Sequence, residues 1–282
     1  MIKADLHIHS NNSDGSDGVK VLAEKVNRSG LNVVALTDHD TTDGLEEFKS
    51  YLSPEIRFIK GIELTCLAGD IKCHILGYGI NPGSEALKEL IIKGKKLRRI
   101  KLDTRIKYLK DVWGIELTKE ETDWLYSRKS VVKTHLANIL VNRGLAEDNI
   151  PAMKKYLDGC KTGNTRFDGE EAINVIKQSG GKVVWAHPLG GEGEEHISED
   201  LLLEQLEKMK SFGIDGMECY YSRYNEKEID FLVRTANEHG LYISGGSDYH
   251  GTNKDIPLGR LNTEDRDIDA EKFTILKSQL FG

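Results

Sequence analysis

Short apolar runs alternate along the chain with longer segments whose apolar positions recur every three or four residues. The short runs predict strands and the longer segments predict helices. The predicted strands cover residues 3–7, 33–37, 58–63, 73–77, 182–186, 216–220 and 241–245. The predicted helices cover residues 19–28, 45–51, 170–178, 199–212, 227–239 and 270–280. This alternation predicts parallel strands covered by helices, either as an open doubly wound sheet or as a closed barrel.

One stretch breaks the alternation. Residues 84–143 show only helical patterns, a long one to about residue 110, then one at 118–128 and one at 134–143. Thr118, with Glu121 three residues later, forms a capping box that predicts the start of the second of these helices. We therefore predict that residues 1–83 and 144–282 form one α/β domain and that residues 84–143 are an inserted helical subdomain.

The insertion also differs in charge from the rest of the chain. It contains 15 Lys and Arg against 8 Asp and Glu, a net charge of +7, which leaves −14 for the remainder of a chain whose total is −7. Most basic runs on helices are solvated faces, and in the run 93–110 Arg105 and Lys107 fit that description. The contrast with an acidic remainder favours an anion-binding cap for others.

Composition narrows the class of protein. The chain has 282 residues, of which 38% are hydrophobic and 30% charged, as in a globular protein with a sizeable core. No apolar run approaches the roughly 20 residues of a membrane span. The acidic, histidine-bearing start does not resemble a secretory signal. The four cysteines show no C-x-x-C spacing, so we expect neither disulfides nor a thiolate zinc site, and we expect a cytoplasmic protein.

Histidines and carboxylates gather at or near the ends of the predicted strands. They are His7, His9, Asp14, His39, Glu63, His74, His187, Asp248 and His250. In parallel α/β folds, ligands bind outside the carboxyl ends of the strands. His7 and His9 are two residues apart on a strand, so both imidazoles point to one face and can reach one ion. The pattern predicts a site for more than one metal ion.

Other residues near these motifs have different predicted roles. We expect Asp5 and Asp38 to support the ligands from behind, Asp5 by accepting the second N–H of an imidazole. His196 lies in a Gly- and Glu-rich loop and is predicted to be solvated. His239 precedes Gly240 at a predicted helix end, where an imidazolium favours the helix dipole.

The order of these motifs resembles the PHP (polymerase and histidinol phosphatase) superfamily. The motifs are Asp5-x-His7-x-His9-Ser10, Ser13-Asp14-Gly15, Thr37-Asp38-His39-Asp40, Gly61-Ile62-Glu63, His74-Ile75-Leu76-Gly77-Tyr78, Ala186-His187-Pro188 and Gly246-Ser247-Asp248-Tyr249-His250. The resemblance runs from residue 2 to about 260. It is greatest to the phosphoesterases that act on nucleoside 3′,5′-bisphosphates and short RNA 5′ ends. It implies a distorted (β/α)7 TIM-like barrel, with the insertion as a substrate cap.

The same resemblance implies three divalent transition-metal ions. His7, His9, Glu63 and Asp248 would hold the first ion. Asp14, His39 and His250 would hold the second. Glu63 would act as a bridge and hold the third ion with His74 and His187. The mixture of imidazole and carboxylate suits manganese, iron or zinc, and ligand type alone does not choose among them.

The resemblance also extends to the insertion. It implies that Arg98, Arg99, Lys101, Lys133, Thr134 and His135 face substrate phosphate. Lysine stands at positions 101 and 133 where the family has arginine, which keeps the charge and loses the bidentate geometry. Tyr224 stands where the family often has histidine, a departure that bears on the substrate and not on the metals.

We therefore expect a metal-dependent phosphomonoester hydrolase with a metal-bridging hydroxide as nucleophile and no protein side chain assigned to catalysis. The expected reaction removes the 3′-phosphate of nucleoside 3′,5′-bisphosphates, with short RNA 5′ ends as further substrates. Histidinol phosphate or another small phosphomonoester is the alternative substrate. An amidohydrolase-type enzyme also opens with H-x-H on its first strand, but we find no strand-end lysine suited to carboxylation, and Glu63 fills the bridging role instead. A non-catalytic, metal-stabilised binding module is the alternative of another class, and the complete set of ligands argues against it. No membrane association and no obligate protein partner are expected.

Overall fold

The computed structural model describes residues 2–192, 194–261 and 268–278. The strands are β1 (Ala4–Ile8), β2 (Val33–Leu36), β3 (Arg57–Ala68), β4 (Ile71–Tyr78), β5 (Phe167–Asp168), β6 (Lys182–Trp185), β7 (Gly216–Tyr221) and β8 (Tyr242–Gly246). The helices are α1 (Val19–Ser29), α2 (Leu45–Tyr51), α3 (Glu85–Trp113), α4 (Lys119–Ser127), α5 (Lys133–Asn142), α6 (Asn149–Tyr156), α7 (Gly169–Gln178), α8 (Glu199–Phe212) and α9 (Glu226–Glu238). Among these described elements, no helix is long and apolar enough to cross a membrane.

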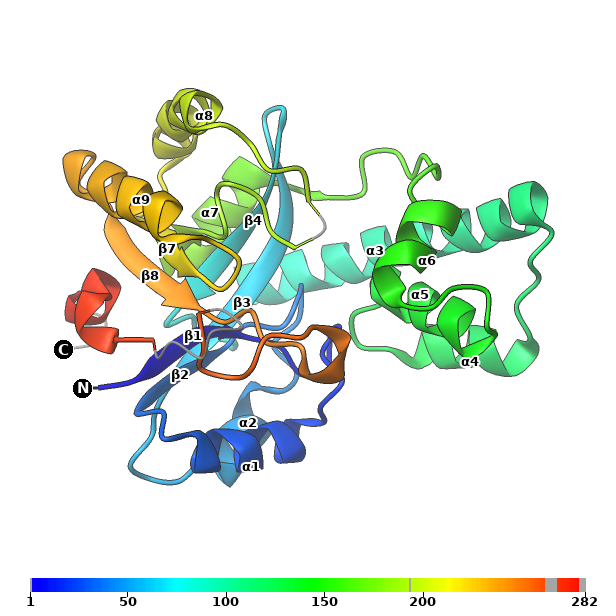
Figure 1. The fold of residues 1–282 in the computed structure, drawn as a ribbon, viewed down its shortest axis with the longest axis horizontal. Helices are drawn as coiled ribbons and strands as arrows, with labels where there is room; N and C mark the ends of the chain where they lie inside the picture. Colours follow the sequence, from blue (N-terminus) through cyan, green and yellow to red (C-terminus); the bar gives the residue numbers. More distant parts are fainter. Residues whose placement is uncertain (1, 193, 262–267, 279–282) are drawn as a thin grey trace.

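Seven strands form a nearly closed barrel in the order β1-β2-β3-β4-β6-β7-β8, and the two-residue strand β5 pairs with β3. A parallel bridge between Ile8 and Tyr249 brings the two ends of the sheet together. The α/β fold predicted from the sequence pattern is confirmed, and so is the barrel-like closure that the family resemblance implied. In Figure 1 the barrel strands lie together, with α1 and α2 on one side and α7, α8 and α9 on the other.

The prediction that all strands are parallel is wrong for β4, which runs antiparallel to both β3 and β6. β3 and β4 extend beyond the predicted runs until only Gly69 and Asp70 separate them. Two residues can close a hairpin but not a parallel crossover, which needs a dozen or more. Gly69 adopts φ 65°, a left-handed conformation that glycine tolerates without strain.

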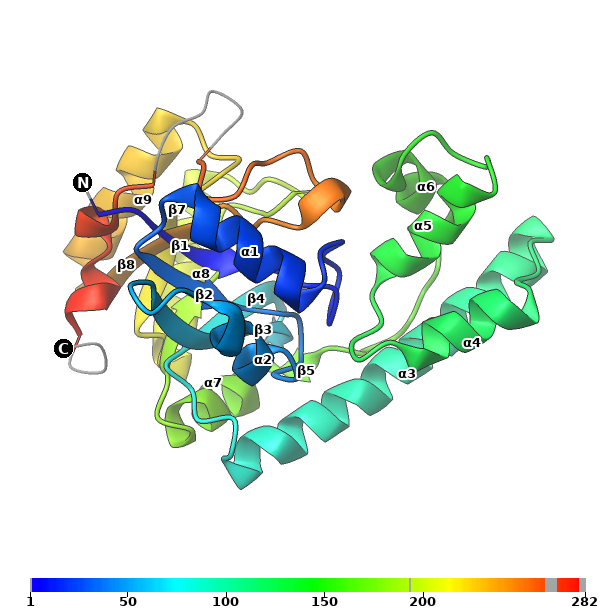
Figure 2. The ribbon, with the colours of Figure 1, turned by 90° about the horizontal axis from the view of Figure 1, so that it is seen from below.

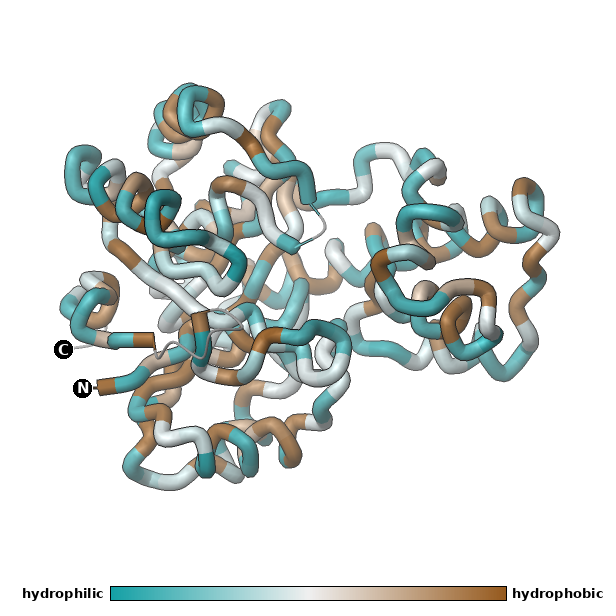
Figure 3. The backbone as a smooth tube through the Cα atoms, viewed as in Figure 1, coloured by the Kyte–Doolittle hydropathy of each residue, from teal (hydrophilic) through white to brown (hydrophobic). Residues whose placement is uncertain are grey.

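Two apolar clusters stabilise the barrel. The larger lies between the strands and the surrounding helices, with Phe48, Leu206 and Leu232 among its buried members. The smaller joins strand residues such as Leu6 and Tyr78 to the segment after β8. Figure 3 shows hydrophobic and hydrophilic residues recurring within each outer helix, as expected for helices with one face on the sheet.

The inserted helices form a unit with a core of their own. Leu109 of α3, Leu125 of α4, Leu136 of α5 and Ala152 of α6 belong to one buried cluster. Figure 2 shows α3 running along one side of the barrel and then beyond it, where α4, α5 and α6 accompany its far end. This helical packing continues through α6, past the predicted boundary at residue 143. The helical pattern around 149–156 is short, and no helix was predicted there.

The helix predicted over residues 270–280 is wrong within the described residues, and positions 279–280 lie outside them. Two 3₁₀ turns, Ala270–Lys272 and Thr274–Lys277, take its place. Ala270, Phe273 and Ile275 are all buried, which a regular α-helix would not achieve at that spacing. The Ala270 amide also donates to the Ile2 carbonyl, so the first of these turns is attached to the N-terminal segment.

Gly94 lets α3 pack directly against the barrel. A Cβ at this position would lie 2.3 Å from Cζ of Phe167, a ring that is itself buried in the core. We predict that Gly94→Ala lowers the free energy of unfolding by about 1–3 kcal/mol, because overpacking outweighs the gain in helix propensity. Lys96→Ala, an exposed site on the same helix, should change it by less than about 0.5 kcal/mol. Urea denaturation of both variants measures the difference, and an unchanged Gly94→Ala would contradict the packing.

Candidate metal centre

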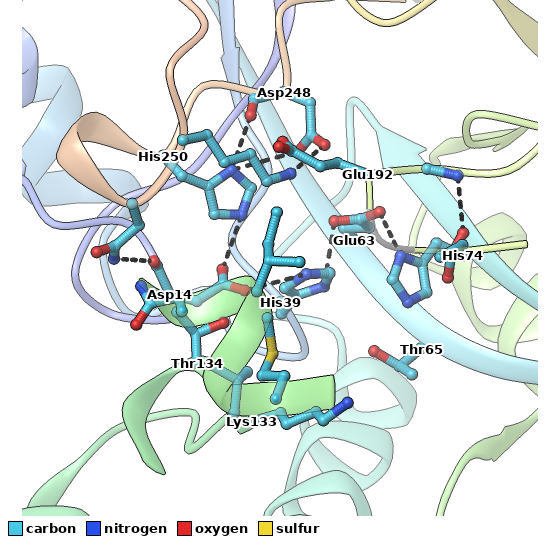
Figure 4. Close-up of a pocket in the computed structure, with 18 of the residues that line it drawn as sticks. Asp14, His39, Glu63, Thr65, His74, Lys133, Thr134, Glu192, Asp248 and His250 are labelled. Atoms are coloured by element: carbon cyan, nitrogen blue, oxygen red, sulfur yellow. Dashed lines mark hydrogen bonds and ion pairs between the residues drawn. The ribbon is translucent and has the colours of Figure 1, made fainter. Parts of the chain in front are cut away.

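The strands bring histidines and carboxylates together at one end of the barrel (Figure 4). Thr65 of β3 pairs with His74 of β4, and Glu63 pairs with Leu76, so Glu63 and His74 lie on the same face of the sheet. A further parallel bridge between His39 and Glu63 extends the pairing of β2 with β3. The ligand-bearing segments are therefore positioned by backbone hydrogen bonds.

Glu63 lies at the centre of this group. Its side chain is 1% exposed. Five imidazole nitrogens surround its two oxygens. Oε2 lies 3.2 Å from Nε2 of His7, 3.2 Å from Nε2 of His9 and 3.1 Å from Nδ1 of His39. Oε1 lies 3.0 Å from Nδ1 of His74 and 3.3 Å from Nε2 of His187. Both oxygens of one carboxylate thus face separate sets of imidazoles.

Asp14 and Asp248 supply the other two carboxylates. Asp14 Oδ1 lies 3.1 Å from Nε2 of His250, and its Oδ2 lies 3.6 Å from Nε2 of His39. Asp248 Oδ1 lies 3.5 Å from Nε2 of His7 and 3.4 Å from Nε2 of His9. All nine ligands predicted from the sequence converge in this region.

The imidazole nitrogens and carboxylate oxygens of the centre are arranged as metal ligands rather than as hydrogen-bonded pairs. Three groups have ligand atoms that all lie within 4.8 Å of each other: His9, Asp14, His39 and His250; His7, His9 and Glu63; and His39, Glu63 and His74. Several of these atoms are buried without a hydrogen-bond partner: His7 Nε2, His9 Nε2, His39 Nδ1, Asp14 Oδ1 and Glu63 Oε2. Leaving so many buried polar atoms unpaired is costly unless a cation binds among them. Nitrogen and oxygen donors of this kind suit divalent transition metals.

The electrostatics keep the carboxylates ionised. Burial alone would raise the pKa of Glu63, but His39, His7 and His74 hold it well below the usual value. Burial likewise opposes ionisation of Asp14, and His250 and His39 keep its pKa well below that of a free carboxyl. Burial would lower the pKa of His9, yet the adjacent carboxylates of Asp248 and Glu63 raise it to about 9.

Three non-glycine residues at the centre have left-handed backbones. They are Asp40 with φ 53°, His187 with φ 27° and Asp248 with φ 57°. Such conformations cost about 1–3 kcal/mol each and persist only when the surroundings fix them. The Asp40 amide donates to the Glu63 carbonyl, and the His187 amide donates to the carboxylate of Glu218. The strain therefore falls on the segments that aim ligands into the site.

The role predicted for Asp5 is wrong in its detail. Its carboxylate accepts from the backbone amides of His7, Ser247 and Gly259, so it joins β1 to the segment after β8 and orients no imidazole. Asp38 accepts from the Ser10 amide and from the Ser13 hydroxyl, which fixes the turn that carries Asp14.

Glu218 of β7 orients an imidazole instead. Its side chain is fully buried, with Oε1 2.9 Å from Nδ1 of His7 and Oε2 accepting from the His187 amide. This residue was not predicted from the sequence. A single carboxylate in the middle of an apolar predicted strand is the signal that could have found it.

A cavity of about 610 Å³ connects the centre to the inserted helices. Among its lining residues are Glu63, His74 and Asp248 of the centre, and Arg98, Lys101, Lys133 and Thr134 of the insertion. Seven charged residues outside the predicted set also line it, among them Arg105, which was expected to be solvated: Arg105, Lys154, Asp158, Arg166, Glu192, Glu194 and Lys254. Their spacing carries no motif, so only the fold brings them to one cavity.

Two residues predicted to face phosphate do not line this cavity. The Arg99 guanidinium stacks 3.9 Å over the Tyr126 ring and donates to the Tyr126 carbonyl. His135 Nδ1 accepts from the Val132 amide at the start of α5. Burial lowers the pKa of His135 to about 4, so this imidazole is neutral at neutral pH.

Comparison with known proteins gives the family. The PHP domain model matches residues 5–165, more than half of the chain. The chain is 29% identical over 258 residues to a 3′,5′-nucleoside bisphosphate phosphatase from Chromobacterium violaceum, covering 89% of this chain and 88% of the relative. It is 29% identical over 262 residues to the 5′-3′ exoribonuclease Rnm of Escherichia coli, covering 91% and 88%.

A solved structure has a similar fold over nearly the whole chain. A Chromobacterium violaceum protein described as an amidohydrolase with bound sulfate and no metal superimposes with a TM-score of 0.80 at 27% identity, covering 92% of this chain and 93% of that one. The chain belongs to the PHP domain family. Within it, the predicted class, a metal-dependent phosphoesterase, is confirmed.

We predict that Glu218→Gln weakens metal binding about 10- to 100-fold, the usual loss when a carboxylate behind a ligating imidazole is removed. The amide can accept from His7 through its oxygen, but its NH₂ group then meets the His187 amide, which is also a donor. Competition with a chromogenic chelator measures the affinity. Glu204→Gln on the exposed face of α8 is the control, and equal affinity in both variants would contradict the role of Glu218.

Proposed function

We propose that the protein removes the 3′-phosphate from nucleoside 3′,5′-bisphosphates. One observation carries the proposal: a buried histidine-carboxylate centre and a set of basic residues line the same cavity of about 610 Å³. We call these basic residues the basic wall; they are Arg98, Lys101, Arg105, Lys133, Lys154 and Arg166. A phosphomonoester needs positive charge around the phosphoryl group being cleaved. A second phosphate on the same substrate accounts for basic residues in the wall beyond those that one phosphate requires. The relative from Chromobacterium violaceum with this activity supports the choice.

We further propose that three divalent ions bind at the centre. His7, His9, Glu63 and Asp248 would hold one, Asp14, His39 and His250 a second, and Glu63, His74 and His187 a third. Glu63 supports this arrangement because its two oxygens face different imidazoles. When bound, such ions polarise a phosphoryl oxygen and lower the pKa of water, which is the chemistry that hydrolysis requires. Manganese, iron and zinc all suit these donors.

The chain's own residues bind and orient the substrate. Arg98, Lys101, Lys133 and Thr134 line the cavity on the insertion side and would contact phosphate oxygens. Lys254 forms an ion pair with Oδ2 of Asp248, and the Tyr221 hydroxyl donates to the same oxygen at 3.0 Å. These two contacts leave Oδ1 of Asp248 facing His7 and His9, so they fix which oxygen is presented to the centre.

Hydrolysis at short RNA 5′ ends is the second candidate. The Escherichia coli exoribonuclease is as similar to this chain as the bisphosphate phosphatase, at 29% identity. Histidinol phosphate and other small monoesters carry one phosphate and would leave much of the basic wall without a partner. A non-catalytic binding module would not require the nine buried or partly buried donor side chains found at this centre.

The substrate prediction is tested on a panel with added manganese. We expect kcat/KM for adenosine 3′,5′-bisphosphate to exceed that for histidinol phosphate at least tenfold, because only the former offers a second phosphate to the basic wall. A short 5′-phosphorylated RNA is assayed beside them. Inorganic phosphate release measures all three, and a preference for histidinol phosphate would reject the proposal.

The proposed metal site leads to a prediction about the metal content of the protein and about its rate of turnover. Purified protein should contain close to three transition-metal ions, and chelation should abolish turnover. His39→Ala and Asp248→Asn should each lower kcat at least about 100-fold, because lost metal polarisation raises the barrier by several kcal/mol. Elemental analysis and steady-state kinetics provide the readouts. Near-normal kcat in either variant would show that the residue holds no catalytic ion.

A further inference from the structure

The basic wall of the cavity contains two kinds of cation. Arg98 donates through Nε to Asp40 at 2.6 Å, and Lys133 forms an ion pair with Asp158. Each of these cations already has a fixed counter-charge. Their ability to attract a further anion is correspondingly reduced.

Lys101, Arg105 and Arg166 differ from them. All three line the cavity, and within residues 2–192, 194–261 and 268–278 none of them forms an ion pair. Nε of Arg105 and Nη1 of Arg166 are shielded from solvent and have no hydrogen-bond partner there. Buried donors without acceptors are rare in folded proteins, so each such group calls for a specific explanation.

The three cations also repel one another. Burial lowers the pKa of Lys101 to about 7, with further contributions from Arg105, Arg98 and Arg166. Burial, with Arg98 and Arg166, lowers the pKa of Arg105 to about 10. An anion placed among these side chains would relieve both the repulsion and the unpaired donors.

The backbone holds these side chains in place. Lys101 and Arg105 are four residues apart on α3, so they lie on the same face of one helix. Arg166 precedes Phe167, whose strand pairs with β3 at Cys66 and whose ring packs against Gly94 of α3. Two rigid elements far apart in the sequence therefore bring the cations to one part of the cavity.

We propose that Lys101, Arg105 and Arg166 form an anion subsite for the substrate phosphate that is not hydrolysed. The subsite lies in the same cavity as the metal centre and has the unneutralised charge that Arg98 and Lys133 lack. The nature of its ligand rests on the proposed function, since a nucleoside bisphosphate carries a phosphate at each end of its ribose. Two guanidinium groups and one ammonium offer enough donors for the oxygens of one phosphate.

The test compares two substrates that differ only in the second phosphate. Arg105→Gln and Arg166→Gln should each lower kcat/KM for adenosine 3′,5′-bisphosphate about tenfold or more. Turnover of adenosine 3′-monophosphate should change less than twofold. Lys107→Gln is the matched control, because Lys107 lies on the same helix, is exposed and pairs with Asp111. Equal losses on both substrates, or no loss on either, would overturn the proposal.

A binding measurement separates this proposal from the proposed function. Adenosine 3′,5′-bisphosphate is titrated by calorimetry into the full chain after chelation, with circular dichroism to verify the fold. The wild type should bind, and each arginine variant should bind about tenfold more weakly. If chelation unfolds the chain, the same titration at equal metal content gives the comparison. A wild type that turns over no nucleotide would reject the function alone, whereas unchanged affinity in both variants would reject the subsite.

Discussion

The structure depends on one buried carboxylate surrounded by imidazoles. Five histidine nitrogens lie within 3.3 Å of the two carboxylate oxygens of Glu63. These histidines come from β1, from β4 and from the segments after β1, β2 and β6. Three of these nitrogens, Nε2 of His7, Nε2 of His9 and Nδ1 of His39, are buried without a hydrogen-bond partner. Cations bound among them would pair these atoms, so the buried clusters fit a site for more than one metal ion.

The inserted helices are attached to the same segments that carry the ligands. Asp40, next to His39, pairs with Arg98 of α3, and the Thr65 amide donates to its other oxygen. The Ser130 amide donates to the Asn12 carbonyl, two residues before Asp14. A shift of the insertion would therefore move the ligand-bearing loops with it. This coupling explains how one cavity can have both a metal centre and a basic wall of defined geometry.

Positive and negative charge are distributed unevenly between the insertion and the rest of the chain. The insertion, at residues 84–143, carries +7 and the rest of the chain −14. The fold then pairs some of the basic residues across the boundary, as in Arg98 with Asp40. Others in the cavity, such as Arg105, form no ion pair with any residue that the structure describes. The net charge of a segment thus indicates the sign of a ligand. The pairing of individual side chains decides which residues attract it.

The residue pattern along the chain was enough to predict a centre of histidines and carboxylates. Histidines and carboxylates at strand ends predicted His7, Glu63 and Asp248 as neighbours, because parallel strands place their carboxyl ends at one edge whatever their order. It also predicted most of the helices, including those at 85–113, 119–127 and 133–142 between β4 and β5. Tertiary structure alone decided the antiparallel β4, the two 3₁₀ turns after residue 269 and the burial of Glu218 behind His7. It alone separated Arg99, stacked on Tyr126, from Arg105 and Arg166, which face the cavity. Strand periodicity is local and can be read along the chain. The partner of a side chain depends on how distant segments pack, as with His7 and Glu218, which are 211 residues apart.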